Sequence, residues 1–312
     1  MRWRPGTALS HKPTTGDRNM KTVGMIGIGM MGHGIATNVA KHGYPLVVLE
    51  HPGNQPVDAL LKAGAKTVPA ISQLAGQADI VILCVTGTPE VEDVLFSAQG
   101  LLSALRPGTI VIDCSTAIPS STERIAAAVQ QAGGRFIDAP MTRTPKEAAE
   151  GRLNLIVGGD ESLYRECLPL LQSFAENITF AGPVGSGHRL KLLHNFVSLG
   201  FSAVLAEAAA CAARADVSPE VLVDVLAKGG GAGVILERLR PFIERGDSSG
   251  FRFTISNALK DMTYYDTMAS EVGASHATAS AIRDTYAGAY GQRSNGTVPE
   301  LVALLAEPAS VR

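Results

Sequence analysis

The feature that most limits how this chain can fold is a glycine-rich turn between an apolar run and a helical segment. The apolar run covers residues 22–27, and residues 27–32 read Gly-Ile-Gly-Met-Met-Gly, a GxGxxG pattern. In this setting the first glycine makes a tight turn, the second lets the backbone approach a pyrophosphate, and the third lets the helix pack closely on the strand. The helix N-terminus then offers free N–H groups to phosphates. The pattern predicts the start of a Rossmann-type dinucleotide-binding domain.

Further apolar runs follow at 45–49, 79–85, 109–113, 134–138 and 153–157. They are apolar throughout rather than alternating, which is typical of strands buried on both faces of a helix-covered parallel sheet. Helical segments such as 35–42 and 121–132 lie between them. This order predicts an α/β Rossmann domain with a doubly wound, mostly parallel sheet.

After about residue 182 the pattern becomes helical. Residues 188–215 form one nearly unbroken helical segment, and Ser218-Pro219-Glu220 has the residue types that start a helix. A glycine loop covers 229–233, and another helix is expected at 256–272. We therefore expect an all-α C-terminal domain. The predicted divisions are a disordered or non-native extension at 1–19, a dinucleotide-binding Rossmann domain at 20–183 and an all-helical domain at 184–312.

Composition narrows the class of protein further. The formal net charge is −2 and only 18% of residues are charged, so the chain has no general basic field for nucleic acid or acidic lipid. The four cysteines form no CxxC pair and the seven histidines no HExxH, so we expect no metal site and a reducing compartment. No uninterrupted apolar run reaches the ~18–20 residues of a membrane span. The expectation is a cytoplasmic protein that binds neither nucleic acid nor membrane.

Glu50 bears on the choice of cofactor. It lies 23 residues after Gly27, at the end of the second apolar run, where an acidic side chain would bond the adenosine ribose. A carboxylate there repels a 2′-phosphate, and the next residue is His51 rather than arginine. We therefore expect NAD to be preferred over NADP. The alternative is an ordinary solvated glutamate at a strand end.

Four separated motifs occur in order between residue 21 and the end of the chain. They are the glycine turn followed by Asn38; Asp113-Cys114-Ser115-Thr116; Asp138-Ala139-Pro140 with 151–153 and 158–159; and Gly185-Ser186-Gly187 with Lys191 and Asn195. Lys260-Asp261 is a weaker fifth match. With these motifs the chain resembles the β-hydroxyacid dehydrogenase family. That family includes 3-hydroxyisobutyrate dehydrogenases, 2-hydroxy-3-oxopropionate (tartronate semialdehyde) reductases and sulfolactaldehyde reductases, and 6-phosphogluconate dehydrogenase is a larger relative.

The resemblance implies that Lys191 is the catalytic acid/base and that Asn195 holds the substrate. A lysine can transfer a proton near neutral pH if burial or neighbouring charges lower its pKa. Lys191, His194 and Asn195 are spaced i, i+3 and i+4, so a helix places them on one face. Several family members have asparagine where His194 stands, and histidine there resembles the 6-phosphogluconate branch. Whether His194 contacts substrate or only packs is left open.

The segment after Asp138-Ala139-Pro140 departs from the common family pattern D-A-P-V-S-G-G. Thr142 replaces the serine and keeps its hydroxyl, while Arg143 and Thr144 replace the two glycines. A guanidinium suits carboxylate, sulfonate or phosphate, and Arg-Thr here is similar to the sulfolactaldehyde reductase branch. The implied substrate is small and anionic, with Ser115 as a further contact. In the alternative, Arg143 points outward and only shapes the loop.

The resemblance also implies where the cofactor binds. Val85-Thr86 stand where the family has Leu-Pro, so only backbone contact is carried over, and Lys260 corresponds to a second family lysine unless it is a plain surface residue. The expected cofactor contacts are Gly27, Ile28, Gly29, Met30, Met31, Gly32, Glu50, Val85, Thr86, Thr116 and Lys260.

These residues together predict an NAD(H)-dependent oxidoreductase that interconverts a short anionic 3-hydroxy acid and its semialdehyde. One alternative is a reductase of a sulfonated or doubly anionic aldehyde that uses Arg143. A second is a non-catalytic dinucleotide-binding module, against which the presence of Lys191 argues. Family analogy implies a homodimer or homotetramer.

Overall fold

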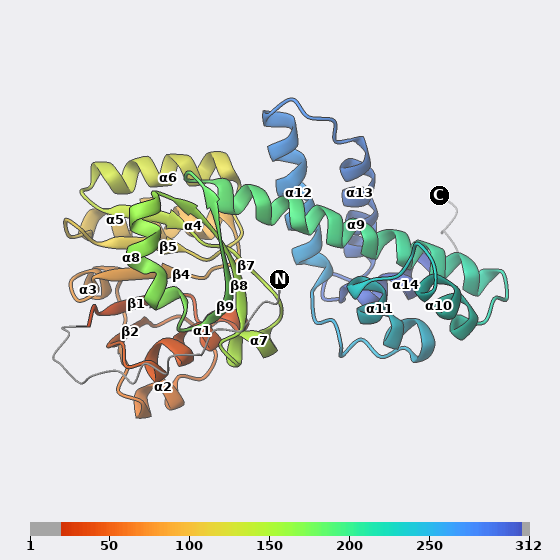
Figure 1. Cartoon of the computed structure of the whole chain (residues 1–312), viewed down its shortest axis with the longest axis horizontal. Helices are drawn as coiled ribbons and strands as arrows, with labels where there is room; N and C mark the ends of the chain where they lie inside the picture. Colours follow the sequence, from red (N-terminus) through yellow and green to blue (C-terminus); the bar gives the residue numbers. More distant parts are fainter. Residues whose placement is uncertain (1–19, 308–312) are drawn as a thin grey trace, which may run out of the picture.

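The computed structural model describes residues 20–307, and the extension expected at 1–19 lies outside the described residues. A sheet with helices on both faces forms one part, and helices alone form the other (Figure 1). The strands of the sheet are β1 (Val23–Ile26), β2 (Leu46–Leu49), β3 (Lys66–Val68), β4 (Ile80–Leu83), β5 (Ile110–Asp113), β6 (Arg135–Asp138), β7 (Met141–Thr142), β8 (Leu153–Gly159) and β9 (Ala175–Gly182).

Six of these strands are parallel and lie in the order β3-β2-β1-β4-β5-β6. Successive side chains of one strand point to opposite faces, so Met25 of β1 packs in one apolar core and Ile26 in another. Both faces are covered by helices, which explains why the strand sequences are apolar throughout. The predicted doubly wound sheet is confirmed.

Each face of the sheet has its own set of helices. One core contains residues of α1 (Met30–Lys41), α2 (Asp58–Lys62), α7 (Pro145–Ala149) and α8 (Glu161–Leu171). The other contains residues of α3 (Ile71–Ala75), α4 (Thr88–Phe96), α5 (Leu101–Ala104) and α6 (Pro119–Gln131).

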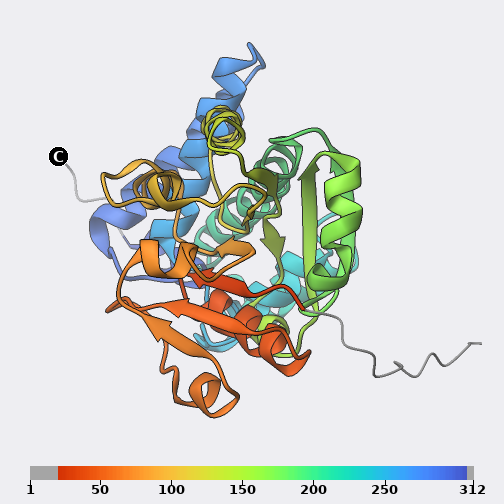
Figure 2. The same ribbon diagram turned by 90° about the vertical axis from the view of Figure 1, so that its left-hand side faces the viewer.

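The last three strands close one side of the sheet, opposite the edge formed by β2 and β3 (Figure 2). β8 pairs antiparallel with β6 and β7 and parallel with β9. The sequence did not indicate β3, β7 or β9. β3 and β7 have only three and two residues, and β9 carries exposed side chains at Glu176 and Asn177. Partly exposed strands lack the continuous apolar run that marks a buried one.

The remaining residues form a helical region with a separate apolar core. Its elements are α9 (Ser186–Arg214), α10 (Pro219–Ala227), α11 (Val234–Arg245), α12 (Ile255–Glu271), α13 (Ala277–Gln292), the short 3-10 helix η1 (Val298–Glu300) and α14 (Leu301–Ala306). Ser218 caps α10 by accepting from the Val221 N–H, as the Ser-Pro-Glu pattern predicts. Thr254 caps α12 in the same way, accepting from the Asn257 N–H.

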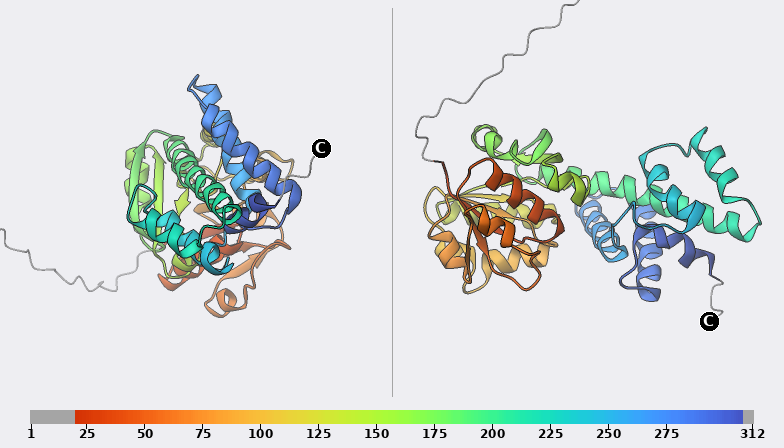
Figure 3. Two further views of the ribbon diagram at one scale, coloured as in Figure 1. Left: turned by 90° about the vertical axis from the view of Figure 1, so that its right-hand side faces the viewer. Right: turned by 90° about the horizontal axis from the view of Figure 1, so that it is seen from below.

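Helix α9 joins the two parts, because it begins at the sheet and continues into the helical region (Figure 3). By length and composition alone it could cross a bilayer, with 44% of its most apolar window buried inside the protein. Its sequence contains no uninterrupted apolar run of this length, because polar residues divide it. α9 packs against α11, α12, α13 and α14, as expected of a core helix.

Candidate active site

The glycine turn has the shape that a dinucleotide pyrophosphate needs. Gly27 has φ 89°, and a Cβ there would lie 2.3 Å from the Cys84 carbonyl oxygen. A Cβ on Gly32 would lie 2.0 Å from the Gly27 oxygen, whereas one on Gly29 would meet no atom within 4 Å. The first turn of α1 carries no acidic residue, so no carboxylate there would compete with a phosphate for its free N–H groups. These residues fit a bound NAD(P) pyrophosphate.

The turn is fastened to the end of β2, where Glu50 is exposed. Asn54 makes the link: its Oδ1 accepts from the Ile28 N–H at 3.2 Å, and its Nδ2 donates to the Leu49 carbonyl at 2.9 Å. The Gln55 N–H also donates to the Ile28 carbonyl at 2.7 Å. Glu50 therefore lies on the same edge as the glycine turn. Sequence reasoning missed Asn54, which carries no motif signal of its own.

The carboxyl ends of β4 and β5 meet at the next part of this edge. The Val85 N–H donates to Ser115 Oγ at 3.0 Å, and the Ser115 N–H donates to Asp113 Oδ1 at 2.9 Å. Val85-Thr86 and Ser115-Thr116 are thus neighbouring loops. Ligands of open α/β sheets bind outside the strand carboxyl ends, so these loops lie where the sequence predicts the cofactor and substrate.

The helical region reaches the same loops through α12. The Thr88 N–H at the start of α4 donates to Tyr264 Oη at 3.0 Å. A Cβ added to Gly87 would lie 3.2 Å from Cδ of Lys260. Lys260 therefore lies beside the loop that follows β4, close to Val85-Thr86.

Lys191 lies on the second turn of α9 and is only 9% exposed. Its pKa is lowered from 10.5 to about 8, chiefly because burial disfavours the charged ammonium. The carboxylate of Asp261 opposes the shift, and the positive charge of Lys260 adds to it. An amine with this pKa can both donate and accept a proton near neutral pH.

Asp261 organises the polar groups around Lys191. It is 3% exposed, its Oδ2 accepts from Asn195 Nδ2 at 2.6 Å, and its Oδ1 lies 2.8 Å from Lys260 Nζ. His194 Nδ1 lies 2.9 Å from Asn195 Oδ1, and burial lowers the pKa of the His194 imidazole. The structure thus brings Lys191, His194, Asn195 and Lys260 into one cluster. Sequence reasoning gave Asp261 no role, although the Lys260-Asp261 match pointed to it.

The segment Thr142–Thr144 is held by contacts within the sheet domain. Arg143 has φ 83°, and its guanidinium binds Glu176 of β9 and the Arg152 carbonyl. Thr144 forms a capping box with Glu147 at the start of α7. Thr142 Oγ1 accepts from Asn154 Nδ2 at 3.2 Å. Within residues 20–307, no hydrogen bond or ion pair joins this segment to the Lys191 cluster.

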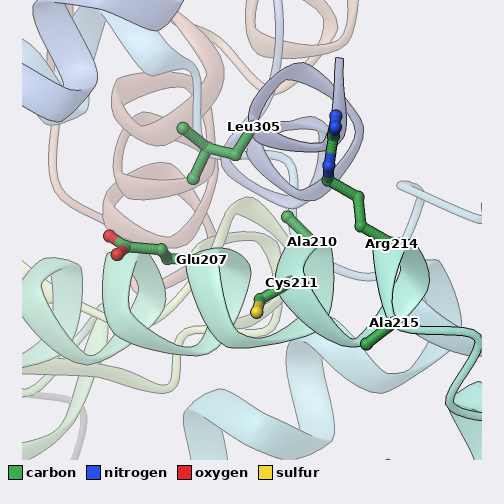
Figure 4. A pocket seen from close by; sticks show the side chains of 6 residues that line it. All are labelled: Glu207, Ala210, Cys211, Arg214, Ala215 and Leu305. Carbon is green, nitrogen blue, oxygen red and sulfur yellow. The ribbon is translucent and has the colours of Figure 1, made fainter. Parts of the chain in front are cut away.

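A shallow hollow at the far end of α9 is a separate feature (Figure 4). Cys211 in this hollow lies about 30 Å along the helix from Lys191, given the rise per residue. The hollow is lined by Glu207, Ala210, Cys211, Arg214, Ala215 and Leu305. It does not belong to the candidate active site.

Comparison with known proteins identifies the family. Residues 22–182 match the NAD-binding domain of 6-phosphogluconate dehydrogenase, and residues 185–302 match the NAD-binding domain of NADP-dependent 3-hydroxyisobutyrate dehydrogenase. The 2-hydroxy-3-oxopropionate reductase of Escherichia coli is 34% identical over 235 residues, 75% of this chain and 80% of that protein. The chain belongs to the β-hydroxyacid dehydrogenase family.

Other members of the family are similar over comparable lengths. The NAD-dependent L-serine dehydrogenase of Pseudomonas aeruginosa is 34% identical over 223 residues, covering 72% of this chain and 74% of that protein. The structure of 3-hydroxyisobutyrate dehydrogenase from Mycobacterium tuberculosis with L-serine matches with a TM-score of 0.82 at 24% identity. The match covers 92% of this chain and all of that one, so the fold is shared throughout. The family is one of oxidoreductases, and NAD(P)-binding domains are present in this chain.

Proposed function

We propose that the protein is an NAD(H)-dependent oxidoreductase that interconverts a short anionic 3-hydroxy acid and its semialdehyde. The substrate would be of the 2-hydroxy-3-oxopropionate or 3-hydroxyisobutyrate type. The observation that carries this proposal is Lys191, a buried amine with a pKa of about 8 next to the amide of Asn195 and the carboxylate of Asp261. A lysine on the solvent-exposed face of a helix would be neither buried nor adjacent to such an amide and carboxylate.

A nicotinamide held beside the loops after β4 and β5 would supply the hydride for the aldehyde carbon in the reductive direction. The Lys191 ammonium donates a proton to the aldehyde oxygen, so an alcohol is formed and the amine is left neutral. In the oxidative direction, the neutral Lys191 amine accepts the hydroxyl proton, and the oxidised nicotinamide would take up the hydride from the carbon. Asp261 holds the Asn195 amide, whose remaining hydrogen-bonding capacity orients the substrate. Val85-Thr86, Thr116 and Lys260 would contact the nicotinamide end of the cofactor.

The contacts of Arg143 favour a carboxylate substrate over a sulfonated one. Its guanidinium already binds Glu176 and the Arg152 carbonyl, so binding a sulfonate would require these contacts to be released. Ser115 and Thr142 then remain as hydroxyl groups for the substrate, with Thr144 engaged in its capping box. A sulfonated aldehyde is therefore the alternative substrate rather than the main one.

A second candidate substrate is L-serine, which is itself a 3-hydroxy acid. The relative from Pseudomonas aeruginosa is named for this substrate, and the structure from Mycobacterium tuberculosis contains it. Oxidation of its hydroxymethyl group needs the same proton transfer to Lys191. We therefore include it among the compounds to test.

The cofactor is proposed to be NAD rather than NADP because the exposed carboxylate of Glu50 follows β2 on the same edge as the glycine turn, where the adenosine ribose would bind. A 2′-phosphate placed there would meet a like charge. Exchange of Glu50 for alanine should weaken the preference for NADH over NADPH, measured as the ratio of kcat/KM values. An unchanged ratio would remove Glu50 from cofactor recognition.

We further propose a cytoplasmic homodimer or homotetramer, with domains at 20–183 and 184–312. Leu190, Leu193, Val197 and Val204 are all more than 40% exposed on α9. Their spacing of three, four and seven residues places them along one side of the helix. An apolar stripe of this kind is the expected contact between subunits.

The decisive experiment follows NADH and NADPH consumption by purified protein. The aldehydes are 2-hydroxy-3-oxopropionate, methylmalonate semialdehyde, succinate semialdehyde and sulfolactaldehyde, with L-serine and 3-hydroxyisobutyrate tested in the oxidative direction. Turnover of one of them supports the proposal and names the substrate class. NADH binding without any turnover would instead favour the non-catalytic module.

Lys191→Ala provides the matching test of mechanism. It should lower kcat by roughly 10²–10⁴-fold, the usual contribution of a general acid, while NADH affinity stays close to the wild-type value. Lys228→Ala is the control, because Lys228 is an exposed lysine that pairs with Asp224 on α10. Wild-type kcat in purified Lys191→Ala would remove this lysine from its proposed role.

A further inference from the structure

Three wholly buried polar residues lie where the sheet meets the start of α9. Asp113 ends β5, Asp138 ends β6, and His188 is in the first turn of α9, each with 0% exposure. Buried groups of this kind are costly unless they are bonded. The proposed proton transfer uses none of them, so their presence needs another explanation.

Asp138 fastens the beginning of α9 to the sheet. Its Oδ1 accepts from the Gly185 N–H at 2.8 Å, and its Oδ2 accepts from the His188 N–H at 2.9 Å. A Cβ on Gly187 would lie 2.7 Å from Asp138 Oδ2 and 2.4 Å from the Ile156 carbonyl oxygen. The glycine therefore allows the first turn to pack directly on the strand ends.

The His188 imidazole joins this turn to the loop and helix that follow β5. Its Nε2 lies 3.1 Å from the Ser115 carbonyl, which can only accept, so Nε2 carries a hydrogen. Its Nδ1 lies 2.8 Å from Thr122 Oγ1 of α6. The two ring nitrogens also lie 3.9 Å and 3.8 Å from the carboxylates of Asp113 and Asp138. One side chain thus contacts α6, the Ser115 loop and both strand ends.

We propose that His188 is a positioning residue that locks the Ser115 loop to the first turn of α9 and so fixes Lys191 relative to the sheet. His188 and Lys191 are three residues apart, so they lie on adjacent turns of one helix face. Ser115 in turn holds the Val85 N–H, which places the loop after β4 in the same bonded unit. The kinetic consequence rests on the proposed function, whereas the lock itself does not.

The lock matters because proton and hydride must move to neighbouring atoms at the same time. Lys191 belongs to α9, while the nicotinamide end of the site belongs to the loops after β4 and β5. A shift of about 1 Å between such groups can lower a rate by about 10²-fold. The hydrogen bonds of His188 join α9, close to Lys191, to the loop after β5 and to α6.

The test uses three variants of the full-length protein and one matched control. His188→Leu removes both ring contacts and keeps apolar bulk, His188→Gln keeps an N–H donor, and Thr122→Val removes only the hydroxyl. Thr122 Oγ1 can also donate to the Ile118 carbonyl four residues earlier. Thr285→Val is the control, because Thr285 donates in the same way to the Ala281 carbonyl but lies partly exposed on α13. Each sample is normalised by counting NADH-binding sites through the fluorescence of bound NADH.

We expect His188→Leu and Thr122→Val to lower kcat by about tenfold or more while KM for NADH changes little. His188→Gln should recover most of the lost kcat, and Thr285→Val should match the wild type. Hydrogen–deuterium exchange in the 113–122 peptide should be faster than in the wild type only for His188→Leu and Thr122→Val. Wild-type kcat and wild-type exchange in these two folded variants would overturn the proposal.

Failure of the proposed function gives a different result from failure of the lock. If the wild-type protein turns over no compound of the panel, the assigned reaction is wrong and the exchange measurement decides about His188 alone. Faster exchange in Thr122→Val would then support the lock, and unchanged exchange would exclude it. Thr122→Val also serves if His188→Leu does not fold.

Discussion

At the scale of the residue, the pKa of Lys191 determines how turnover depends on pH. With a pKa of about 8, the amine is mostly protonated below pH 8 and mostly neutral above it. Because reduction needs the ammonium and oxidation the neutral amine, kcat/KM for reduction should fall, and kcat/KM for oxidation rise, as pH increases through about 8. Asp261 raises the pKa of Lys191, so Asp261→Asn should move both transitions to lower pH. Profiles of kcat/KM against pH measure this, and a transition moved upward would contradict it.

The backbone conformation of Arg143 gives a second prediction for a single residue. Arg143 is not a glycine, yet its backbone is in the left-handed region. Arg143→Ala removes the contacts to Glu176 but keeps a Cβ in the left-handed conformation, whereas Arg143→Gly removes both the contacts and the Cβ. Arg143→Gly should be more stable than Arg143→Ala by about 1 kcal/mol, the usual cost of a left-handed residue with a Cβ. Both should turn over a carboxylate aldehyde such as 2-hydroxy-3-oxopropionate like the wild type. Urea denaturation and a parallel assay measure this, and loss of turnover confined to sulfolactaldehyde would favour the sulfonated substrate.

At the scale of the element, α9 depends on a buried carboxylate at its first turn. Asp138→Asn replaces one of two accepting oxygens with an NH₂ group that faces an N–H, so it should lower the free energy of unfolding by about 2–3 kcal/mol. Asp160→Asn at the start of α8 is the matched control, since Asp160 accepts from the Leu163 N–H on the exposed surface. Urea denaturation of both variants makes the comparison. Equal losses would mean that burial does not strengthen the cap at Asp138.

The elements also show what could be predicted from sequence. β1, β4 and β5 are buried on both faces and therefore appear as apolar runs, whereas β9 exposes side chains and gives no such signal. Helical spacing was enough to group Lys191 with Asn195. Asp261 and Ser115 lie 66 and 73 residues from their partners Asn195 and His188, so only the fold shows these contacts. The side-chain direction of Arg143 likewise depends on β9.

At the scale of the whole molecule, the exposed stripe on α9 predicts association. Val197 and Val204 are 68% and 60% exposed, and burying them between subunits would remove apolar surface from water. The wild-type protein should sediment as a dimer or tetramer, and the double variant Val197→Asp, Val204→Asp as a smaller species. Val272→Asp is the control, because Val272 is 67% exposed at the end of α12. A monomeric wild-type protein in analytical ultracentrifugation would exclude this assembly.

The continuity of α9 has a mechanical consequence for the molecule. The helix has 29 residues and is therefore about 43 Å long. It has no break at which the two parts of the chain could bend. A tilt of its first turn, at the strand ends, would therefore move the whole helix. A tilt of about 5° at its first turn carries its last turn through roughly 4 Å. A small adjustment around a bound nicotinamide would thus be amplified at the distant end of the rod.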